Sequence, residues 1–224
     1  MQNLYQAERS LIQRTFEKYD AYGAGKYFLT TPNQQEQLKS CGLIDLTHLS
    51  RVGFRGADAA LYLQREGYRT PDVPNTVLEQ EDNSFVGRLS ATEYLLLGSL
   101  KDFGDKIAAL ESNWQMNEYI NYLLPRQDSH AWIMLTGEYV SAIMAKLCGV
   151  DLSPEEFEPG HIVQTSVARI NAIVLNVSDE VCPKFSILCD RSASLYLWEV
   201  LLDAMDEFNG KVIGVNTLLE APQL

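Results

Sequence analysis

The same pattern of residues occurs twice in the chain, and this repeat restricts the possible folds more than any other feature. An apolar, strand-like run ends at Gly56 and leads into a short amphipathic segment, and a second run does the same at Gly137. When the two glycines are aligned, the apolar positions that follow them superpose: Ala59, Tyr62 and Leu63 on Val140, Ile143 and Met144. This spacing is typical of the buried side of a helix. We therefore expect a duplicated unit of strands and helices.

The elements after each short helix follow one order in both halves. The short helices are expected to end at Gly67 and Gly149, because glycine adopts a left-handed cap most easily. Three β-prone runs and a longer helix follow in each half. The runs are 76–78, 85–89 and 94–97 in the first half and 162–167, 172–177 and 185–189 in the second. The order β-α-β-β-β-α predicts the class α+β, with duplicated ferredoxin-like halves and helices on one face of largely antiparallel sheets.

Apolar residues at helical spacing mark the longer helix of each half. In the first half they are Phe103, Ile107, Leu110 and Trp114. In the second half Asp190 is expected to cap the helix and Gly210 to end it. The predicted buried face of this last helix consists of Leu195, Trp198, Leu202 and Met205.

The length of 224 residues suits one compact unit or two small, tightly fused halves. We divide a single unit, 1–224, into an N-terminal helix and loop (1–36), a first repeat (37–114), a bridge (115–132) and a second repeat (133–224). Within these parts we expect helices over 4–19 and 34–41, extended chain over 43–54, and strands over 119–124 and 212–215. The two repeats therefore account for most of the sequence.

Charge and hydropathy exclude several classes of partner. The net charge is −12, with 18 basic against 30 acidic residues. Nucleic acid requires clustered Lys and Arg, so a nucleic-acid partner is not expected. An acidic chain is not attracted to an anionic membrane surface either, and no run approaches the ~18 apolar residues of a membrane span. The first twenty residues lack the apolar region of a signal peptide.

The cysteines indicate reduced thiols rather than a metal site. Cys41, Cys148, Cys182 and Cys189 show no CxxC spacing and no neighbouring histidine, so zinc is not expected. We expect a cytoplasmic protein, where thiols stay reduced.

Spacing alone predicts no catalytic residue and no metal ligand. His48, His130 and His161 have no partner at metal spacing and are expected in structural or surface roles. No G-x-S-x-G nucleophile pattern is present. The lone G-x-G at Gly23 and Gly25 follows a predicted helix rather than a strand, which excludes a Rossmann interpretation.

The patterns of the acidic and aromatic residues also favour structural roles over catalytic ones. Glu79, Glu81 and Asp82 could supply a general base, but their composition is typical of a hairpin turn. The acidic run at 155–158 is typical of the first turn of a helix, where the dipole favours negative charge. The tryptophans Trp132 and Trp198 lie in apolar patterns and are expected in the core.

One stretch resembles a known family. The residues GLIDLTHL at 42–49 and VGFRGADAALYLQ at 52–64 resemble the folate-binding region of the glycine-cleavage aminomethyltransferase family. The resemblance continues at DNSFVGRL, 82–89, and EYLLL, 93–97, which match a hairpin of that family, and it is weaker at 133–137 and 185–198. In all it covers about residues 36–213 and implies the fold of that folate-binding domain.

Within this superfamily the chain is most similar to the gamma subunits of heterotetrameric sarcosine oxidase. The similarity rests on the chain length and on LCGVDL at 147–152, FEPG at 157–160, VQT at 163–165 and LW at 197–198. Such subunits keep the folate-domain fold without the C-terminal barrel of the full transferase. The resemblance implies a complex for oxidative demethylation of sarcosine in one-carbon metabolism. Its larger alpha and beta subunits, the expected partners, would carry FAD, FMN, NAD and tetrahydrofolate, and this chain none.

Two departures from the family pattern argue against independent catalysis. The catalytic aspartate of the family lies in an Asp-Asp pair, which is Asp82-Asn83 here. The glutamate that anchors folate in the family falls at Ser186, and a serine cannot make the bidentate, charge-assisted contact of a carboxylate. The resemblance therefore implies a non-catalytic structural subunit. A docking role also predicts more exposed apolar surface than a monomer usually carries.

Two alternatives remain at this stage. In the first, the chain binds tetrahydrofolate as a stand-alone aminomethyltransferase-like protein, with Asp82, Asn83 and Arg88 as the folate-binding residues. Asp82 would orient the N5/N10 edge of the folate, and Arg88 or Arg169 would lie near its glutamyl tail. In the second, the chain is a stand-alone folate-domain-like protein of iron–sulfur cluster maintenance, whose relatives carry a late cysteine. Here that residue would be Cys189, which is expected in the core.

Overall fold

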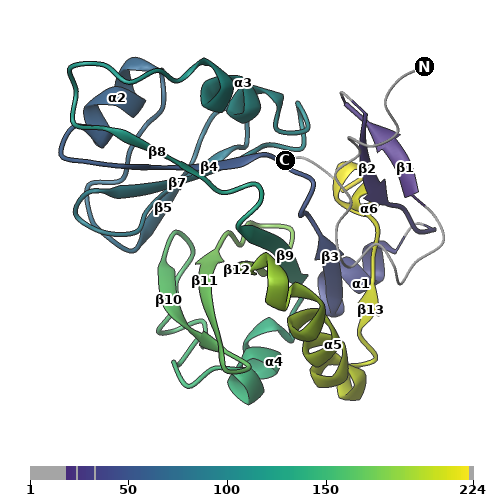
Figure 1. The fold of residues 1–224 in the computed structure, drawn as a ribbon. Coiled ribbons are helices and arrows are strands. Elements are labelled where there is room, and N and C mark those ends of the chain that lie inside the picture. The colour runs from purple at the N-terminus through teal and green to yellow at the C-terminus, as the bar shows by residue number, and fades with distance from the viewer. Residues whose placement is uncertain (1–18, 24, 33, 222–224) are drawn as a thin grey trace.

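The computed structural model describes residues 19–23, 25–32 and 34–221. The helix predicted over 4–19 lies outside the described residues except for Tyr19, which belongs to a strand. A small hairpin of β1 (Tyr19–Tyr22) and β2 (Lys26–Leu29) precedes helix α1 (Gln35–Ser40) and strand β3 (Gly42–Asp45). Strand β3 and the later strands form two larger, mostly antiparallel sheets with helices on their outer sides (Figure 1).

Both halves show the order β-α-β-β-β-α. The first half comprises β4 (Arg51–Arg55), α2 (Ala59–Arg65), β5 (Thr76–Glu79), β6 (Phe85–Arg88), β7 (Glu93–Leu97) and α3 (Asp105–Asn113). The second comprises β9 (His130–Thr136), α4 (Val140–Leu147), β10 (Ile162–Val167), β11 (Ile170–Asn176), β12 (Lys184–Asp190) and α5 (Ser194–Met205). Between them lies β8 (Tyr122–Pro125), and the chain ends with β13 (Lys211–Val212) and α6 (Val215–Leu219). Short 3-10 turns, Arg191–Ala193 and Asp206–Phe208, flank α5.

The strand order within the sheets differs from a ferredoxin-like arrangement. The five-stranded sheet has the order β5-β6-β7-β4-β8, and the six-stranded sheet β10-β11-β12-β9-β3-β13. A split β-α-β unit would contain neighbouring parallel strands, but every pair is antiparallel except β13 with β3. The short turns between β5, β6 and β7 allow only adjacent antiparallel strands, and α2 carries the chain across to the far edge. Each half is therefore a three-strand meander closed by its own first strand.

The two halves exchange a strand. β3 directly precedes β4 in the chain but pairs with β9 of the other half, Gly42 opposite Thr136. β8 directly precedes β9 but pairs with β4, Gly53 opposite Leu124. The segment 43–54, expected as one extended run, is consequently two strands in different sheets, joined by a turn over 46–50. Because each sheet contains a strand from the other half, neither sheet is complete without its counterpart.

The exchange explains the repeated glycine of the sequence. A Cβ on Gly56 would lie 2.0 Å from the carbonyl oxygen of Ile120, and one on Gly137 would lie 2.1 Å from that of Ser40. Ile120 and Ser40 stand just before the exchanged strands β8 and β3. Both glycines have positive φ, +154° and +102°. The backbone just before each exchanged strand thus packs directly on one of the two glycines, where no side chain fits.

The second pair of glycines behaves differently. Gly67 has the expected left-handed conformation, with φ +86°. Gly149 is not among the residues with positive φ, so the predicted left-handed cap is wrong there. The physical reason is that α4 ends at Leu147 and passes directly into extended chain, where Cys148 forms an antiparallel bridge to Val167.

Gly137→Ala is expected to lower the free energy of unfolding by about 3 kcal/mol, because a Cβ at positive φ is strained and would also overlap the Ser40 carbonyl. Gly149→Ala is the control, since a Cβ added there would have no atom within 4 Å, and its change should stay below about 1 kcal/mol. Urea unfolding of both variants measures the difference. Equal midpoints would contradict the close approach at Gly137.

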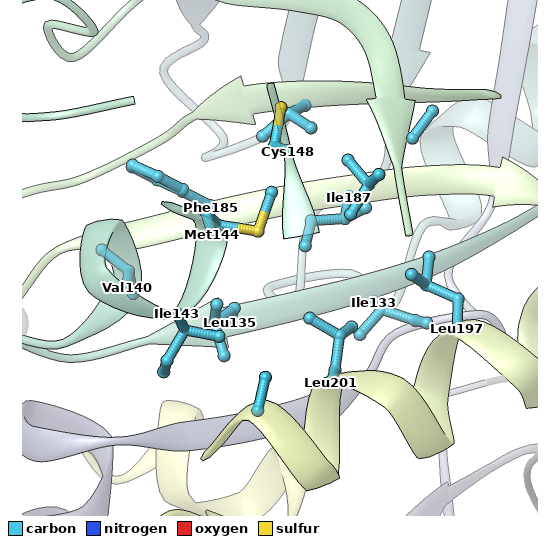
Figure 2. Packing of buried hydrophobic residues seen from close by; sticks show 14 of the residues in the cluster. Ile133, Leu135, Val140, Ile143, Met144, Cys148, Phe185, Ile187, Leu197 and Leu201 are labelled. Carbon is cyan, nitrogen blue, oxygen red and sulfur yellow. The ribbon is translucent and has the colours of Figure 1, made fainter. Parts of the chain in front are cut away.

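The molecule has four layers, in the order helices, sheet, sheet and helices. Three clusters of buried residues lie between these layers. Alternate residues of β9 separate two of them: Ile133 and Leu135 face α4 and α5, while Trp132 and Met134 face the other sheet. Figure 2 shows the first cluster, where Ile133 and Leu135 meet side chains of both helices. A third cluster lies under α2 and α3. Both sheets are therefore buried on two faces.

The buried face of the last helix, α5, differs from the predicted one. Asp190 caps the turn before α5, as its Oδ1 accepts a hydrogen bond from the Ser192 amide at 2.8 Å. Trp198 and Met205 are buried as expected, but Leu195 is exposed. The buried stripe follows 194, 197, 198, 201, 204 and 205, because α5 packs on β9 and α4 through this side.

Candidate functional site

Asp82, the surviving carboxylate of the family hairpin, is held by neighbouring side chains. It lies in the turn between β5 and β6, and its Oδ1 accepts hydrogen bonds from the Ser84 amide at 3.0 Å and hydroxyl at 2.5 Å. Its Oδ2 forms an ion pair with Lys106 Nζ of α3 at 2.6 Å. Burial raises its pKa, but the hydrogen bonds from Lys106 and Ser84 outweigh this effect and lower the pKa to about 2.

The other predicted folate residues form hydrogen bonds with groups other than Asp82 or lie exposed in a turn. Asn83 is exposed at positive φ and donates from Nδ2 to Glu79 at 2.6 Å. The Arg88 guanidinium donates to backbone carbonyls, including those of Asp72 at 2.5 Å and Ala91 at 2.7 Å. Arg169 lies exposed in the turn between β10 and β11. Asn83 and Arg88 thus hold loops of the first half.

Ser186, the position of the folate-anchoring glutamate of the family, is fully buried between the sheets. Its Oγ accepts a hydrogen bond from the indole Nε1 of Trp132 at 3.1 Å, and Trp132 is itself 1% exposed. Met134 and Leu188 surround this pair in the same inter-sheet core. Large side chains therefore fill the space that an anchoring carboxylate would face. The sequence did not indicate that Trp132 contacts Ser186, because the two residues lie 54 positions apart.

A second set of buried hydrogen bonds joins the chain segments that connect β3 to β4 and β8 to β9. Arg51, at the start of β4, is fully buried. Its Nη1 donates to the carbonyls of Thr47 and Leu49, each at 2.8 Å, in the connection from β3 to β4. Its Nε donates to the carbonyl of His130 at 2.9 Å and its Nη2 to that of Gln127 at 2.8 Å, in the connection from β8 to β9. Sequence reasoning missed this residue, because an arginine inside a strand is usually on the surface.

His130 lies beside this arginine, and its surroundings shift its pKa strongly. Its Nδ1 is 2.8 Å from the Ser129 hydroxyl, and its Nε2 is 3.3 Å from Nη1 of Arg126. Burial and, to a smaller extent, the positive charges of Arg126 and Arg51 together lower its pKa to about 4, against the opposing charge of Asp190. The ring is therefore neutral at pH 7.

This shift predicts a loss of stability in mild acid. As the pH falls from about 6.5 to about 4, the unfolded chain binds a proton at His130 that the folded chain does not, so the free energy of unfolding decreases. His130→Gln cannot titrate and should flatten the stability profile in this window. Urea unfolding at several pH values checks the slope. Imidazole resonances of His130 that titrate near pH 6.5 in the folded protein would contradict the prediction.

Two surface hollows are large enough for small ligands. The first, of about 420 Å³, lies over β10 and β11 and contains no carboxylate in its lining: His130, Gln164, Thr165, Ser166, Asn171, Ala172, Ile173 and Leu188. The second, of about 330 Å³, lies where the loop before β5 meets β10, and Asp151 and Glu156 stand in its wall. Asp82, Asn83 and Arg88 line neither hollow. Neither of these two hollows therefore joins the predicted folate residues to a cavity.

The cysteines give no metal site within the described residues. Cys41, Cys148, Cys182 and Cys189 are all buried and have free thiols. Burial raises the pKa of Cys41 and of Cys189 to about 11, so both stay protonated at neutral pH. No group of three or more His, Cys, Asp or Glu residues with metal-binding geometry occurs in the part of the chain that the structure describes. No helix there is both long and apolar enough to cross a membrane.

The two antiparallel sheets, packed face to face with outer helices, define the class of the protein as a mixed α+β fold of the aminomethyltransferase type. Two solved structures share it. A chain of the heterotetrameric sarcosine oxidase from Corynebacterium sp. U-96, in complex with pyrrole 2-carboxylate, matches with a TM-score of 0.63 and 20% identity over 81% of this chain and 89% of that chain. The glycine cleavage system aminomethyltransferase T from Bartonella henselae matches with a TM-score of 0.66 and 16% identity over 92% of this chain.

These similarities confirm the resemblance seen in the sequence at the level of fold. The chain spans 58% of the length of the Bartonella aminomethyltransferase. The shares covered in the sarcosine oxidase comparison, 81% and 89%, are close, so that matched chain is similar in length to this one. No protein-family model and no curated protein sequence matches the chain.

Proposed function

We propose that this chain is a gamma-type, non-catalytic structural subunit of a heterotetrameric sarcosine oxidase-like complex. The observation that carries the proposal is the filled inter-sheet core at Ser186. A hydroxyl accepts the Trp132 indole hydrogen bond at 3.1 Å where the family places a carboxylate. A buried, satisfied hydrogen bond of this kind stabilises packing and offers no group to a ligand. The similar length of the matched sarcosine oxidase chain also supports a subunit role.

The state of Asp82 supports the same conclusion. A general base works best when its pKa lies near the operating pH, whereas the pKa of Asp82 is lowered to about 2. Its two oxygens already accept hydrogen bonds from Ser84 and Lys106. In the proposed complex, the larger subunits carry FAD, FMN, NAD and tetrahydrofolate, and this chain contributes a folded platform that stabilises them.

Co-expression with tagged alpha- and beta-type subunits of a sarcosine oxidase tests this proposal. We expect the chain to copurify with them in a fixed ratio and to raise the thermal stability of the complex. Asp82→Ala should leave sarcosine oxidation by the complex unchanged, because the proposed function assigns this residue no role in chemistry. A chain that remains alone in this experiment is not a subunit.

The surviving Asp82 favours one second candidate, a stand-alone tetrahydrofolate-binding protein. Calorimetry with tetrahydrofolate at millimolar concentration separates the two functions. The structural role predicts no heat of binding. A measurable heat that disappears in Asp82→Ala and in Arg88→Ala would replace the structural role with folate binding.

A further inference from the structure

The β1–β2 hairpin is anchored on the chain just before α3. The Nζ of Lys26, in β2, donates hydrogen bonds to the hydroxyl of Ser50 at 3.0 Å and to the carbonyl of Phe103. It also forms an ion pair with Oδ1 of Asp105 at 3.4 Å. The ring of Tyr22, in β1, stacks on the ring of Phe103, with 5.3 Å between the two centroids and 29° between the planes. Two side chains of the hairpin therefore hold the point where α3 begins.

The backbone at this point is strained. Phe103 has φ +51°, a left-handed conformation that is unfavourable for an aromatic residue and persists where the surrounding structure holds it. Gly104 also has positive φ, +78°, and a Cβ there would lie 2.7 Å from the amide nitrogen of Ser50. The turn at 103–104 is thus packed between the hairpin and the connection from β3 to β4. Its conformation depends on both neighbours.

The helix that starts at this turn carries the cation of the Asp82 ion pair. Lys106 is the second residue of α3, and its amide donates to Oδ2 of Asp102 at 2.9 Å. Oδ1 of Asp102 accepts from the amide of Gly104, also at 2.9 Å. From this first turn the Nζ of Lys106 reaches Oδ2 of Asp82 at 2.6 Å. The position of the first turn of α3 therefore determines whether the ion pair forms.

We propose that the β1–β2 hairpin is a strap, which holds the turn at 103–104 in its strained conformation and thereby keeps Lys106 on Asp82. When the hairpin detaches, Phe103 relaxes, the first turn of α3 shifts and Asp82 loses its cation. Lys26 is then a positioning residue, since it acts on Asp82 through the residues on either side of the turn. This inference goes beyond the proposed function and does not depend on it.

Two variants of the hairpin test the strap. Lys26→Met removes the contacts of the ammonium group, and Tyr22→Leu removes the ring stack without a change of charge. In both we expect the pKa of Asp82, followed by its carboxyl ¹³C resonance, to rise from about 2 toward its ordinary value of 3.8. The amides of Lys106 and Ala108 should also exchange with solvent about tenfold faster, because the first turn of α3 opens more often.

The matched control is Lys101→Met, which removes a positive charge from an exposed position in the same loop. It should leave the pKa of Asp82 at about 2. Circular dichroism and the melting temperature verify that each variant is folded, and Tyr22→Leu decides the result if Lys26→Met is not. A pKa of Asp82 that stays at about 2 in the folded hairpin variants overturns the inference. An equal rise in Lys101→Met overturns it too, since loss of charge alone would then explain the effect.

Discussion

Arg51→Met is expected to lower the free energy of unfolding by about 4 kcal/mol, because it leaves several buried carbonyls without their donor. The four carbonyls belong to Thr47, Leu49, Gln127 and His130. Thr47, Leu49 and Gln127 lie in the two connections through which the halves exchange β3 and β8, and His130 is the residue where the second connection enters β9. For a chain of this size the melting temperature should fall by roughly 8–16 °C.

The control for Arg51→Met is Arg55→Met in the same strand. Arg55 is exposed, and its nitrogen lies 3.9 Å from a carboxylate oxygen of Glu93. A surface pair of this kind contributes about 0–1 kcal/mol, so the control should unfold close to the wild-type midpoint. Urea denaturation of the three proteins measures the difference. If both variants lose the same small amount, Arg51 does not hold the two connections together.

Ser186→Glu, which restores the family's carboxylate, is expected to destabilise the folded chain by about 3–5 kcal/mol. The position is fully buried, and Trp132, Met134 and Leu188 fill the space around it. A larger side chain would overpack this core, and its charge would be buried without a cationic partner. Ser166→Glu, on an exposed position of β10, is the control and should change stability by less than about 0.5 kcal/mol.

Ser186→Ala separates the effect of charge from that of the lost hydrogen bond. It removes the acceptor for the Trp132 indole, which costs about 1–3 kcal/mol when the donor stays buried. Thermal and urea unfolding of the series give the order expected: Ser166→Glu least affected, then Ser186→Ala, then Ser186→Glu. A Ser186→Glu variant that is as stable as the wild type and binds tetrahydrofolate would show that the inter-sheet space is an open pocket.

Local patterns predicted the elements better than their partners. The spacing after Gly56 and Gly137 predicted α2 and α4, whose buried residues are the aligned apolar ones. The periodicity of the last helix placed Trp198 and Met205 correctly, yet it counted Leu195 as buried. Leucines occur at helical spacing on more than one side of α5, and only the packing of α5 on α4 and β9 decides which side is buried.

The candidate site was the least predictable part. Asp82 was recognised from a family pattern, but its ion pair with Lys106 joins residues 24 positions apart. The pairing of Trp132 with Ser186 and the contacts of Arg51 across the connections are longer still in sequence. Such contacts depend on where strands lie in space, and no residue spacing encodes that.

The sequence by itself determined that the chain is duplicated, that its two units consist of strands and helices in one order, and that a glycine must follow the first strand of each. These are short-range properties, because periodicity and steric freedom act within a few residues. The tertiary structure alone decided that the halves exchange β3 and β8 and form meanders rather than split β-α-β units. The apolar strands have nearly equal local patterns, so the sequence pattern does not say which strand pairs with which. Only the packing of the two sheets against each other makes one pairing lowest in free energy.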